Sequence, residues 1–119
     1  MAKGNMRTLK RSECVVMPLV LTYKWFDMID KGDKREEYRA DTKRYCVRFM
    51  NFSTRANNIV GKEFKKKVVR FQRGYNKPSM FWCCDIEFRN KGMARHPEWG
   101  EPDAPHWVLC LLERVKLEG

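Results

Sequence analysis

This sequence of 119 residues has no long hydrophobic run. Its longest apolar stretch, CVVMPLVL, has eight residues, whereas a membrane helix needs about 20. A basic segment precedes that stretch, as in a secretory signal, but no small-residue cleavage site follows it. We therefore expect neither a signal peptide nor a membrane partner.

The cysteines and histidines do not form the sequence patterns of a disulfide framework or of a metal site. The five cysteines are odd in number and contain no CxxC pair, which argues against a disulfide framework and against a zinc site. We expect free, partly buried thiols in a reducing, cytoplasmic location. The two histidines, His96 and His106, have no neighbouring ligands, so we expect no metal and no cofactor.

Acidic residues are scarce in the middle third of the chain. Residues 41–77 carry eleven Lys/Arg and two Asp/Glu, which is +9 of the total net charge of +10. Such an excess suggests a phosphate-bearing partner, because Lys and Arg displace counterions from nucleic acid. The alternative is a basic surface that only aids solubility, and residues 65–67 fit either a phosphate track or a solvated face.

The length and composition predict one folded domain. A chain of 119 residues can bury one core but not two, and its 43% hydrophobic content excludes wholesale disorder. Residues 1–14 are basic and poor in apolar side chains, so we expect a flexible arm there and a single domain over residues 15–119.

The hydrophobic pattern predicts about five strands and two helices. Thr22 and Gly32 bracket the first helix as its caps, Asp41 opens the second, and Pro18 marks its strand as an edge or bulged strand. Because most strands are joined by loops, we expect an α+β fold, a small, mostly antiparallel, barrel-like sheet with both helices packed at its side. The expected strands are residues 15–21, 34–39, 65–75, 79–90 and 106–115, and the expected helices are 23–31 and 41–52.

Three ordered motifs resemble a known family. KWFDMIDKGDKREEYR resembles the signature of the ASCH domain, which belongs to the PUA-like superfamily: a short helix, a Gly, an x-Lys, and a strand carrying Glu-x-Arg. VVRFQRGYNKPSMFWCCDIEF and HPEWGEP are similar to later parts of the small bacterial and phage members. The resemblance runs from about Met17 to Val115.

The resemblance implies a PUA-like β-barrel with a cleft beside the first helix. ASCH domains are thought to bind RNA or nucleotides there, one branch hydrolyses N4-acetylcytidine, and others are reported as nucleases. The amidohydrolase branch has a Gly-x-Lys-x-x-Thr motif, of which Lys34 matches the lysine while Glu37 stands at the threonine position.

Lys34, Glu37 and Arg39 are the centre of the expected site. For an enzyme, Glu37 would activate a water and a charged Lys34 would polarise the reacting group. We expect Glu36 and Glu37 to raise the pKa of Lys34 and keep it protonated, which favours ligand binding over proton abstraction. The alternative is a solvated strand with cross-strand ion pairs, in which Lys34 faces away from Glu37 and Arg39.

Three further groups complete the expected ligand-binding site. Tyr23, Lys24 and Trp25 start a helix and suit an anion, although the tryptophan fits core packing equally well. Arg70, Arg73 and Tyr75 flank a turn and fit a phosphate and a base, or a polar hairpin end. Glu98 and Trp99 close over a ligand, or form a structural turn.

These features together predict a domain that binds RNA or a modified nucleotide or nucleoside. The alternatives are an enzyme of the same fold, either an amidohydrolase on N4-acetylcytidine-like nucleosides or a ribonuclease, and a protein-interaction module whose basic face meets an acidic partner. The sequence leaves the oligomeric state open.

Overall fold

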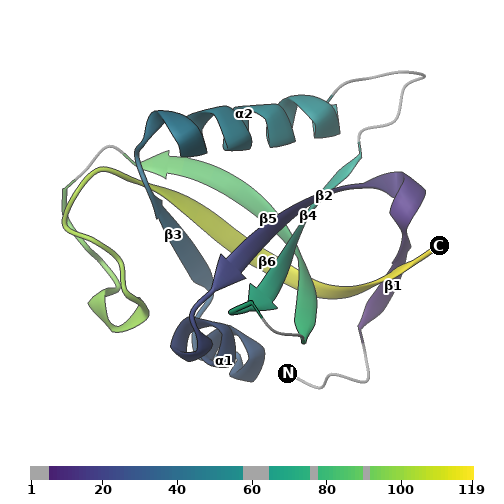
Figure 1. Cartoon of the computed structure of the whole chain (residues 1–119), viewed down its shortest axis with the longest axis horizontal. Coiled ribbons are helices and arrows are strands. Elements are labelled where there is room, and N and C mark those ends of the chain that lie inside the picture. Colours follow the sequence, from purple (N-terminus) through teal and green to yellow (C-terminus); the bar gives the residue numbers. More distant parts are fainter. Residues whose placement is uncertain (1–5, 58–64, 76–77, 90–91) are drawn as a thin grey trace.

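The computed structural model describes residues 6–57, 65–75, 78–89 and 92–119. Along these residues lie six strands, two α-helices and two short 3-10 helices. They are β1 (Arg7–Lys10), η2 (Arg11–Glu13), β2 (Cys14–Leu21), α1 (Tyr23–Lys31), β3 (Glu36–Ala40), α2 (Lys43–Asn57), β4 (Lys66–Arg73), β5 (Ser79–Arg89), η3 (Pro97–Trp99) and β6 (His106–Glu118). Both α-helices belong to the first half of the chain, as predicted, and they lie at opposite ends of the sheet (Figure 1).

The six strands form one mixed sheet. Its order is β1-β6-β5-β4-β2, and β3 pairs with the first half of β6, on the same edge as β1. Three pairings are antiparallel, but β1–β6 and β2–β4 are parallel. The α+β class is therefore confirmed, whereas the expected mostly antiparallel sheet is wrong, and the sheet is not closed into the expected barrel. The connection between β2 and β4 contains α1, β3 and α2, which is long enough for the parallel pairing that a tight turn could not make.

Strand β2 is an edge strand, as its proline predicted. It pairs only with β4 within the described residues. Pro18 has no N–H to donate, and an edge position leaves that missing donor without cost to the sheet. The other edge of β2 is therefore open to side chains that can bond its carbonyl oxygens.

Local signals set the ends of α1. Thr22 is the N-cap residue and its carbonyl oxygen accepts the N–H of Phe26 at 3.1 Å. Gly32 ends the helix at φ 84°, in the left-handed region that glycine tolerates. Phe26 and Ile29 are the buried residues of the helix, while Trp25 is only half-buried.

Helix α2 differs from its prediction at both ends. Its first turn is capped by Thr42, whose Oγ1 accepts the N–H of Tyr45 at 3.3 Å, so the expectation that Asp41 is the cap is wrong. The helix continues to Asn57, five residues beyond the expected end at residue 52. The 3.6-residue period extends that far, because Ala56 follows Phe49 and Phe52 on the buried face.

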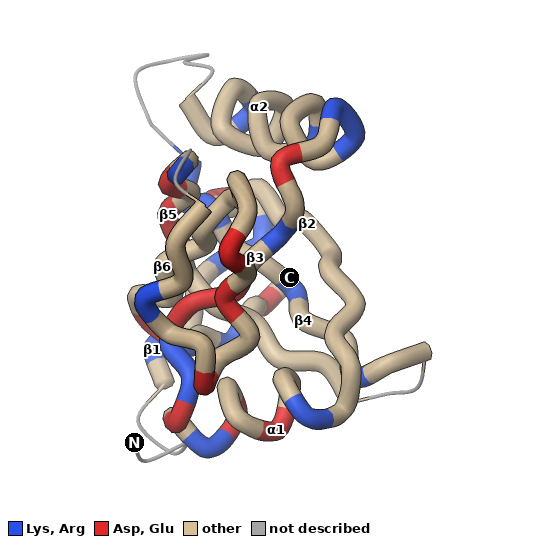
Figure 2. The backbone as a smooth tube through the Cα atoms, turned by 90° about the vertical axis from the view of Figure 1, so that its left-hand side faces the viewer, with Lys and Arg blue, Asp and Glu red and all other residues tan. Residues whose placement is uncertain are grey.

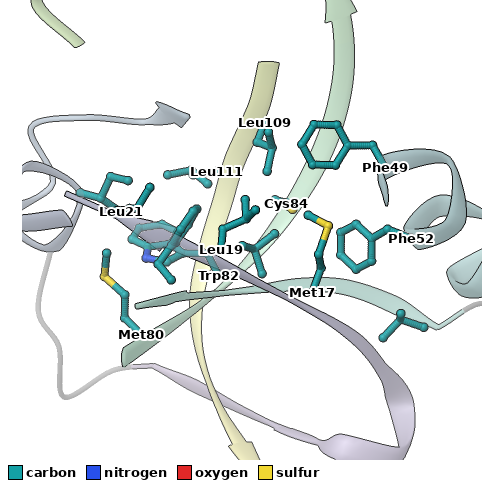
Figure 3. Close-up of a cluster of buried hydrophobic side chains, with 14 of the residues drawn as sticks. Met17, Leu19, Leu21, Phe49, Phe52, Met80, Trp82, Cys84, Leu109 and Leu111 are labelled. Atoms are coloured by element: carbon teal, nitrogen blue, oxygen red, sulfur yellow. The ribbon is translucent and has the colours of Figure 1, made fainter. Parts of the chain in front are cut away.

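The core fills the space between the sheet and the two helices (Figure 3). Alternate residues of β2, β5 and β6 point into it, and the aromatic residues of α2 close one end. The residues labelled in the figure are Met17, Leu19, Leu21, Phe49, Phe52, Met80, Trp82, Cys84, Leu109 and Leu111.

Part of the expected flexible arm belongs to the sheet. Arg7–Lys10 form β1, which runs parallel to the end of β6. Leu9 is buried in a small apolar cluster with Val68 and Val115. A single leucine among basic residues gives no strand period, so the sequence pattern did not reveal this pairing.

The described residues contain no helix that is long and apolar enough to cross a membrane. All five cysteines are free, as expected, and two of them, Cys14 and Cys84, are buried.

Candidate functional site

The turn after α1 delivers Lys34 to the protein interior. The N–H of Gly32 bonds the carbonyl oxygen of Ile29 at 3.1 Å, and the N–H of Lys34 bonds that of Met28 at 3.2 Å. These bonds close the helix end and direct the chain back toward β3. Lys34 therefore precedes β3 and does not follow the alternation of its side chains.

The ammonium group of Lys34 is enclosed by polar and aromatic groups. The residue is only 2% exposed, and its Nζ donates a hydrogen bond to the carbonyl oxygen of Trp99. Nζ also lies 3.2 Å from Oε1 of Glu37. The ring centroids of Trp25 and Tyr38 are 4.5 and 4.8 Å from it, at cation–π distance. The alternative of a solvated strand therefore does not hold at this position.

Burial lowers the pKa of Lys34 below its ordinary value, and the negative charge of Glu37 only partly opposes this effect. From the sequence we expected the neighbouring carboxylates to raise this pKa. That expectation is wrong in direction, because desolvation of a buried ammonium outweighs its attraction to one carboxylate.

Glu37 connects Lys34 to Arg39. The second carboxylate oxygen of Glu37 accepts a hydrogen bond from Nη2 of Arg39 at 3.1 Å. Arg39 also donates to the carbonyl oxygen of Val20 at 2.9 Å and to the hydroxyl of Tyr45 at 3.1 Å. The three residues of the sequence motif thus form one chain of contacts from the interior to the free edge of β2.

Beside Arg39 lies a groove of about 640 Å³, which we call the arginine groove. It runs along β2 and the adjoining part of β4, from the first turns of α2 to the N-cap of α1. Figure 2 shows the Lys and Arg positions at the start of α2 above β2. No acidic residue is among the described residues that line it. They are Pro18, Leu19, Val20, Leu21, Thr22, Arg39, Arg44, Tyr45, Arg48, Arg70, Gln72, Gly74 and Tyr75.

The four arginines of the groove differ in what they bond. Arg39 and Arg48 each donate to a carbonyl oxygen on the free edge of β2, Arg48 to Pro18 at 2.6 Å. Arg44 and Arg70 have no hydrogen bond or ion pair within the described part of the chain. Among the described residues, two guanidinium groups are thus unpaired and a third bonds only a neutral acceptor.

Two of these arginines were missed by the sequence analysis. Arg44 and Arg48 are four residues apart on α2 and therefore share a helix face. That spacing was a usable signal. What it does not reveal is that this face lies over β2, because the packing of α2 depends on contacts between distant elements.

The structure places the residues expected around the turn after β4 in two different locations. Arg70 and Tyr75 line the arginine groove, and Tyr75 is 91% exposed. Arg73 instead donates to both carboxylate oxygens of Asp27, at 2.9 and 3.1 Å, and its guanidinium lies 4.0 Å from the ring centroid of Tyr23. Its charge is therefore already compensated, and Tyr23 belongs to this cluster on α1.

The segment around Trp99 packs over Lys34. His96 stacks on Trp99 with ring centroids 4.1 Å apart, and Nδ1 of His96 lies 3.4 Å from the exposed Glu98 carboxylate. Gly100 has φ 81°, and a Cβ at this position would lie 2.6 Å from Cζ2 of Trp25. The segment is thus a turn fitted against Trp25.

Lys24 extends this group at the surface. Its Nζ lies 4.5 Å from the ring centroid of Trp25, on the helix that also carries Tyr23. Of the residues predicted at the start of α1, Trp25 therefore contacts Lys34, whereas Lys24 and Tyr23 remain on the outside of the helix.

A buried Glu101–His106 pair supports the same segment and was not predicted. The two side chains are 1% exposed, and Nε2 of His106 lies 2.8 Å from Oε2 of Glu101. Oε1 of Glu101 accepts the backbone N–H groups of Arg95 and His96, each at 2.9 Å. Burial by itself raises the pKa of Glu101, but these hydrogen bonds lower it below its ordinary value. No spacing of residues in the sequence indicates such a contact.

No protein-family model, no curated protein and no solved structure matches this chain. In the described part of the chain, no group of three or more His, Cys, Asp or Glu side chains is placed to hold a metal ion.

Proposed function

We propose that the protein binds single-stranded RNA or a nucleotide in the arginine groove. The observation that carries this proposal is the lining of the groove: four arginines and two tyrosines with no acidic residue among the described ones. A phosphate backbone satisfies such a surface, because each contact with Lys or Arg releases a counterion.

The arginines are available for a phosphate without breaking the fold. Arg44 and Arg70 are unpaired within the described residues, and the acceptor of Arg48 is a neutral carbonyl oxygen. An anionic phosphate oxygen is a stronger acceptor than a carbonyl, so Arg48 gains by exchanging one for the other. Tyr75, exposed at the end of the groove, offers a ring on which a base can stack.

The resemblance to the ASCH domain supports the same location. Arg39, the last residue of that motif, lines the groove, and its guanidinium donates a hydrogen bond to the Glu37 carboxylate. In this proposal Lys34 and Glu37 are positioning residues: they fix the Arg39 guanidinium, and the ligand contacts Arg39 itself.

Fluorescence anisotropy with a labelled oligouridylate, measured over a series of salt concentrations, tests the proposal. A log–log plot of affinity against salt concentration should be linear, with a slope of about −0.7 for each phosphate contact. Arg44→Gln and Arg48→Gln should each weaken binding and reduce the slope. Arg55→Gln is the matched control, because Arg55 is exposed on the same helix but outside the groove. No binding at low salt, or equal losses in all three variants, would remove the proposal.

A second candidate is hydrolysis of an acylated cytidine at Lys34 and Glu37. The observation that favours it is the lowered pKa of Lys34, a change that a reactive lysine requires. Because the ammonium is enclosed, a substrate reaches it only if the segment carrying Trp99 moves away. Acetate release from N4-acetylcytidine, with loss of release in Glu37→Gln, would support this reaction, and RNA binding without acetate release would leave only the first proposal.

A further inference from the structure

The sheet has a face opposite to its core, which we call the outer face. Phe81 belongs to it, because this residue lies between Met80 and Trp82, and both of these belong to the core cluster. Successive side chains of a strand point to opposite faces, so the ring of Phe81 points away from the core. The buried residues of both α-helices belong to the core cluster, so the helices pack on the other side of the sheet.

A row of side chains leads from the arginine groove onto the outer face. The strand registers pair Pro18 with Arg70 and Arg70 with Phe81, and directly opposite residues share a face. Pro18 and Arg70 both line the arginine groove, and the carbonyl oxygen of Pro18 accepts the hydrogen bond of Arg48. Neighbouring strands are about 4.8 Å apart, so Phe81 lies about 10 Å from Pro18, within reach of a ligand in the groove.

Phe81 is fixed on one side and accessible on the other. Its ring packs against a cluster that contains the buried Val68 and Val115, and the residue is only half-buried. A ring that packing already holds loses little freedom when a planar group stacks on it. Beside it lies Arg70, which has no partner among the described residues.

The neighbouring rows of the outer face present no competing charge. On one side, Val20, Gln72 and Ser79 are opposite one another and uncharged. On the other side, Glu113 is bonded to Arg7 at 2.6 Å. Among the described residues of these rows, no carboxylate is therefore left unpaired to repel a phosphate.

We propose that the ligand of the arginine groove is a single strand of several nucleotides, one base of which stacks on Phe81. This inference rests on the proposed function and extends it from the groove to the outer face. Arg48 and Arg70 contact successive phosphates, and the strand crosses β2 to reach the ring. Aromatic side chains on an open sheet surface bind the unstacked bases of a single strand in this way. A mononucleotide cannot occupy both places, and the bases of a duplex are already stacked on one another.

Fluorescence anisotropy with two labelled probes tests the stacking directly. The probes are octauridylate and an abasic oligomer of the same length and charge, and wild type should bind octauridylate more tightly. Phe81→Leu keeps an apolar side chain against Val68 and Val115 but removes the aromatic face. It should weaken octauridylate binding about tenfold, the loss typical of one stacking ring. Binding of the abasic oligomer and the salt slope should not change, because no charge is altered.

Phe88→Leu is the matched control, because Phe88 is 44% exposed on the same strand but is outside the groove and pairs with Trp107. It should bind both probes like wild type. Equal losses in the two variants, or unchanged octauridylate binding in Phe81→Leu, would overturn the inference. If Arg44→Gln still weakens octauridylate binding, the proposed function remains and only the stacking fails. No binding of either probe at low salt would remove both.

A second measurement keeps the test valid if circular dichroism shows that Phe81→Leu does not fold. Ultraviolet crosslinking of the wild-type chain to octauridylate that contains 4-thiouridine, followed by mass spectrometry, should place a crosslink on Phe81. Crosslinks confined to the groove residues Tyr45 and Tyr75 would overturn the inference. Sedimentation addresses the other possible occupant of the outer face. A wild-type dimer that Phe81→Leu dissociates would assign this face to a second copy of the chain and would also overturn it.

Discussion

Nζ of Lys34 and Oε1 of Glu37 lie 3.2 Å apart, and both side chains are buried. This buried ion pair joins the end of α1 to β3 and, through the carbonyl oxygen of Trp99, to the segment before β6. Removing one partner of such a pair leaves the other with an uncompensated buried charge. Its effect on stability can therefore be measured separately from ligand binding.

The first prediction concerns Lys34→Met, which keeps the length of the side chain without its charge. The variant should lose about 3 kcal/mol of unfolding free energy at neutral pH, because Glu37 and the Trp99 carbonyl oxygen lose a donor. Urea denaturation measures this loss. Unchanged stability would show that the pair contributes nothing to the fold.

The same two proteins differ in pH dependence. The pKa of Lys34 is lowered in the folded state, so between that value and its ordinary 10.5 the unfolded chain binds more protons. The unfolding free energy contributed by this group therefore rises as the pH rises through that interval. The wild type should gain stability relative to Lys34→Met on the alkaline side, and a constant difference would contradict the lowered pKa.

The structure shows which signals in the sequence were local. The ends of α1 were predicted because Thr22 and Gly32 act within one helical turn, and the edge position of β2 was predicted because Pro18 lacks an N–H. The parallel pairing of β2 with β4 was not predicted, since it depends on how the long connection through α1, β3 and α2 folds back onto the sheet.

The same distinction between local and distant signals applies to the candidate site. The motif brought Lys34, Glu37 and Arg39 together correctly, but the dense charge of the stretch around them suggested a solvated strand. Burial of Lys34 depends on Trp25 and on Trp99, which lies 65 residues further along the chain. Such distant packing leaves no periodic trace in the sequence.

A second prediction uses two glycines with the same backbone conformation. Gly32 and Gly100 have φ 84° and 81°, but a Cβ at Gly32 meets nothing within 4 Å, whereas one at Gly100 meets the ring of Trp25 at 2.6 Å. Gly32→Ala should cost about 1 kcal/mol from backbone strain alone. Gly100→Ala should cost about 2–4 kcal/mol, because the Trp25 ring must also move. Equal shifts in thermal denaturation would show that the contact of Trp25 with this turn has no stabilising effect.

The third prediction concerns β1. Leu9 is 6% exposed and packs with Val68 and Val115, so Leu9→Ala should cost about 2–3 kcal/mol. Thr8→Ala, at an exposed position of the same strand, should change stability by less than about 0.5 kcal/mol. Chemical denaturation of both variants decides the point. If neither variant is destabilised, residues 7–10 behave as the flexible arm that the composition suggested.

The last prediction concerns the Glu101–His106 pair and its behaviour in acid. Glu101→Gln should cost about 2–3 kcal/mol at pH 7, because the carboxylate accepts bonds from His106 and from two backbone N–H groups. The pKa of Glu101 is lower in the folded state than its ordinary 4.5, so its stabilising effect is fully present above pH 4.5 and disappears as the pH falls through the folded value.

The stability difference between wild type and Glu101→Gln should therefore shrink steadily below pH 4.5. Glu98→Gln is the matched control in the same segment, since Glu98 is exposed, and its stability should follow that of the wild type at every pH. A difference for Glu101→Gln that persists unchanged at low pH would mean that its carboxylate is not ionised in the folded protein. The segment that covers Lys34 would then be held by a neutral hydrogen bond between Glu101 and His106.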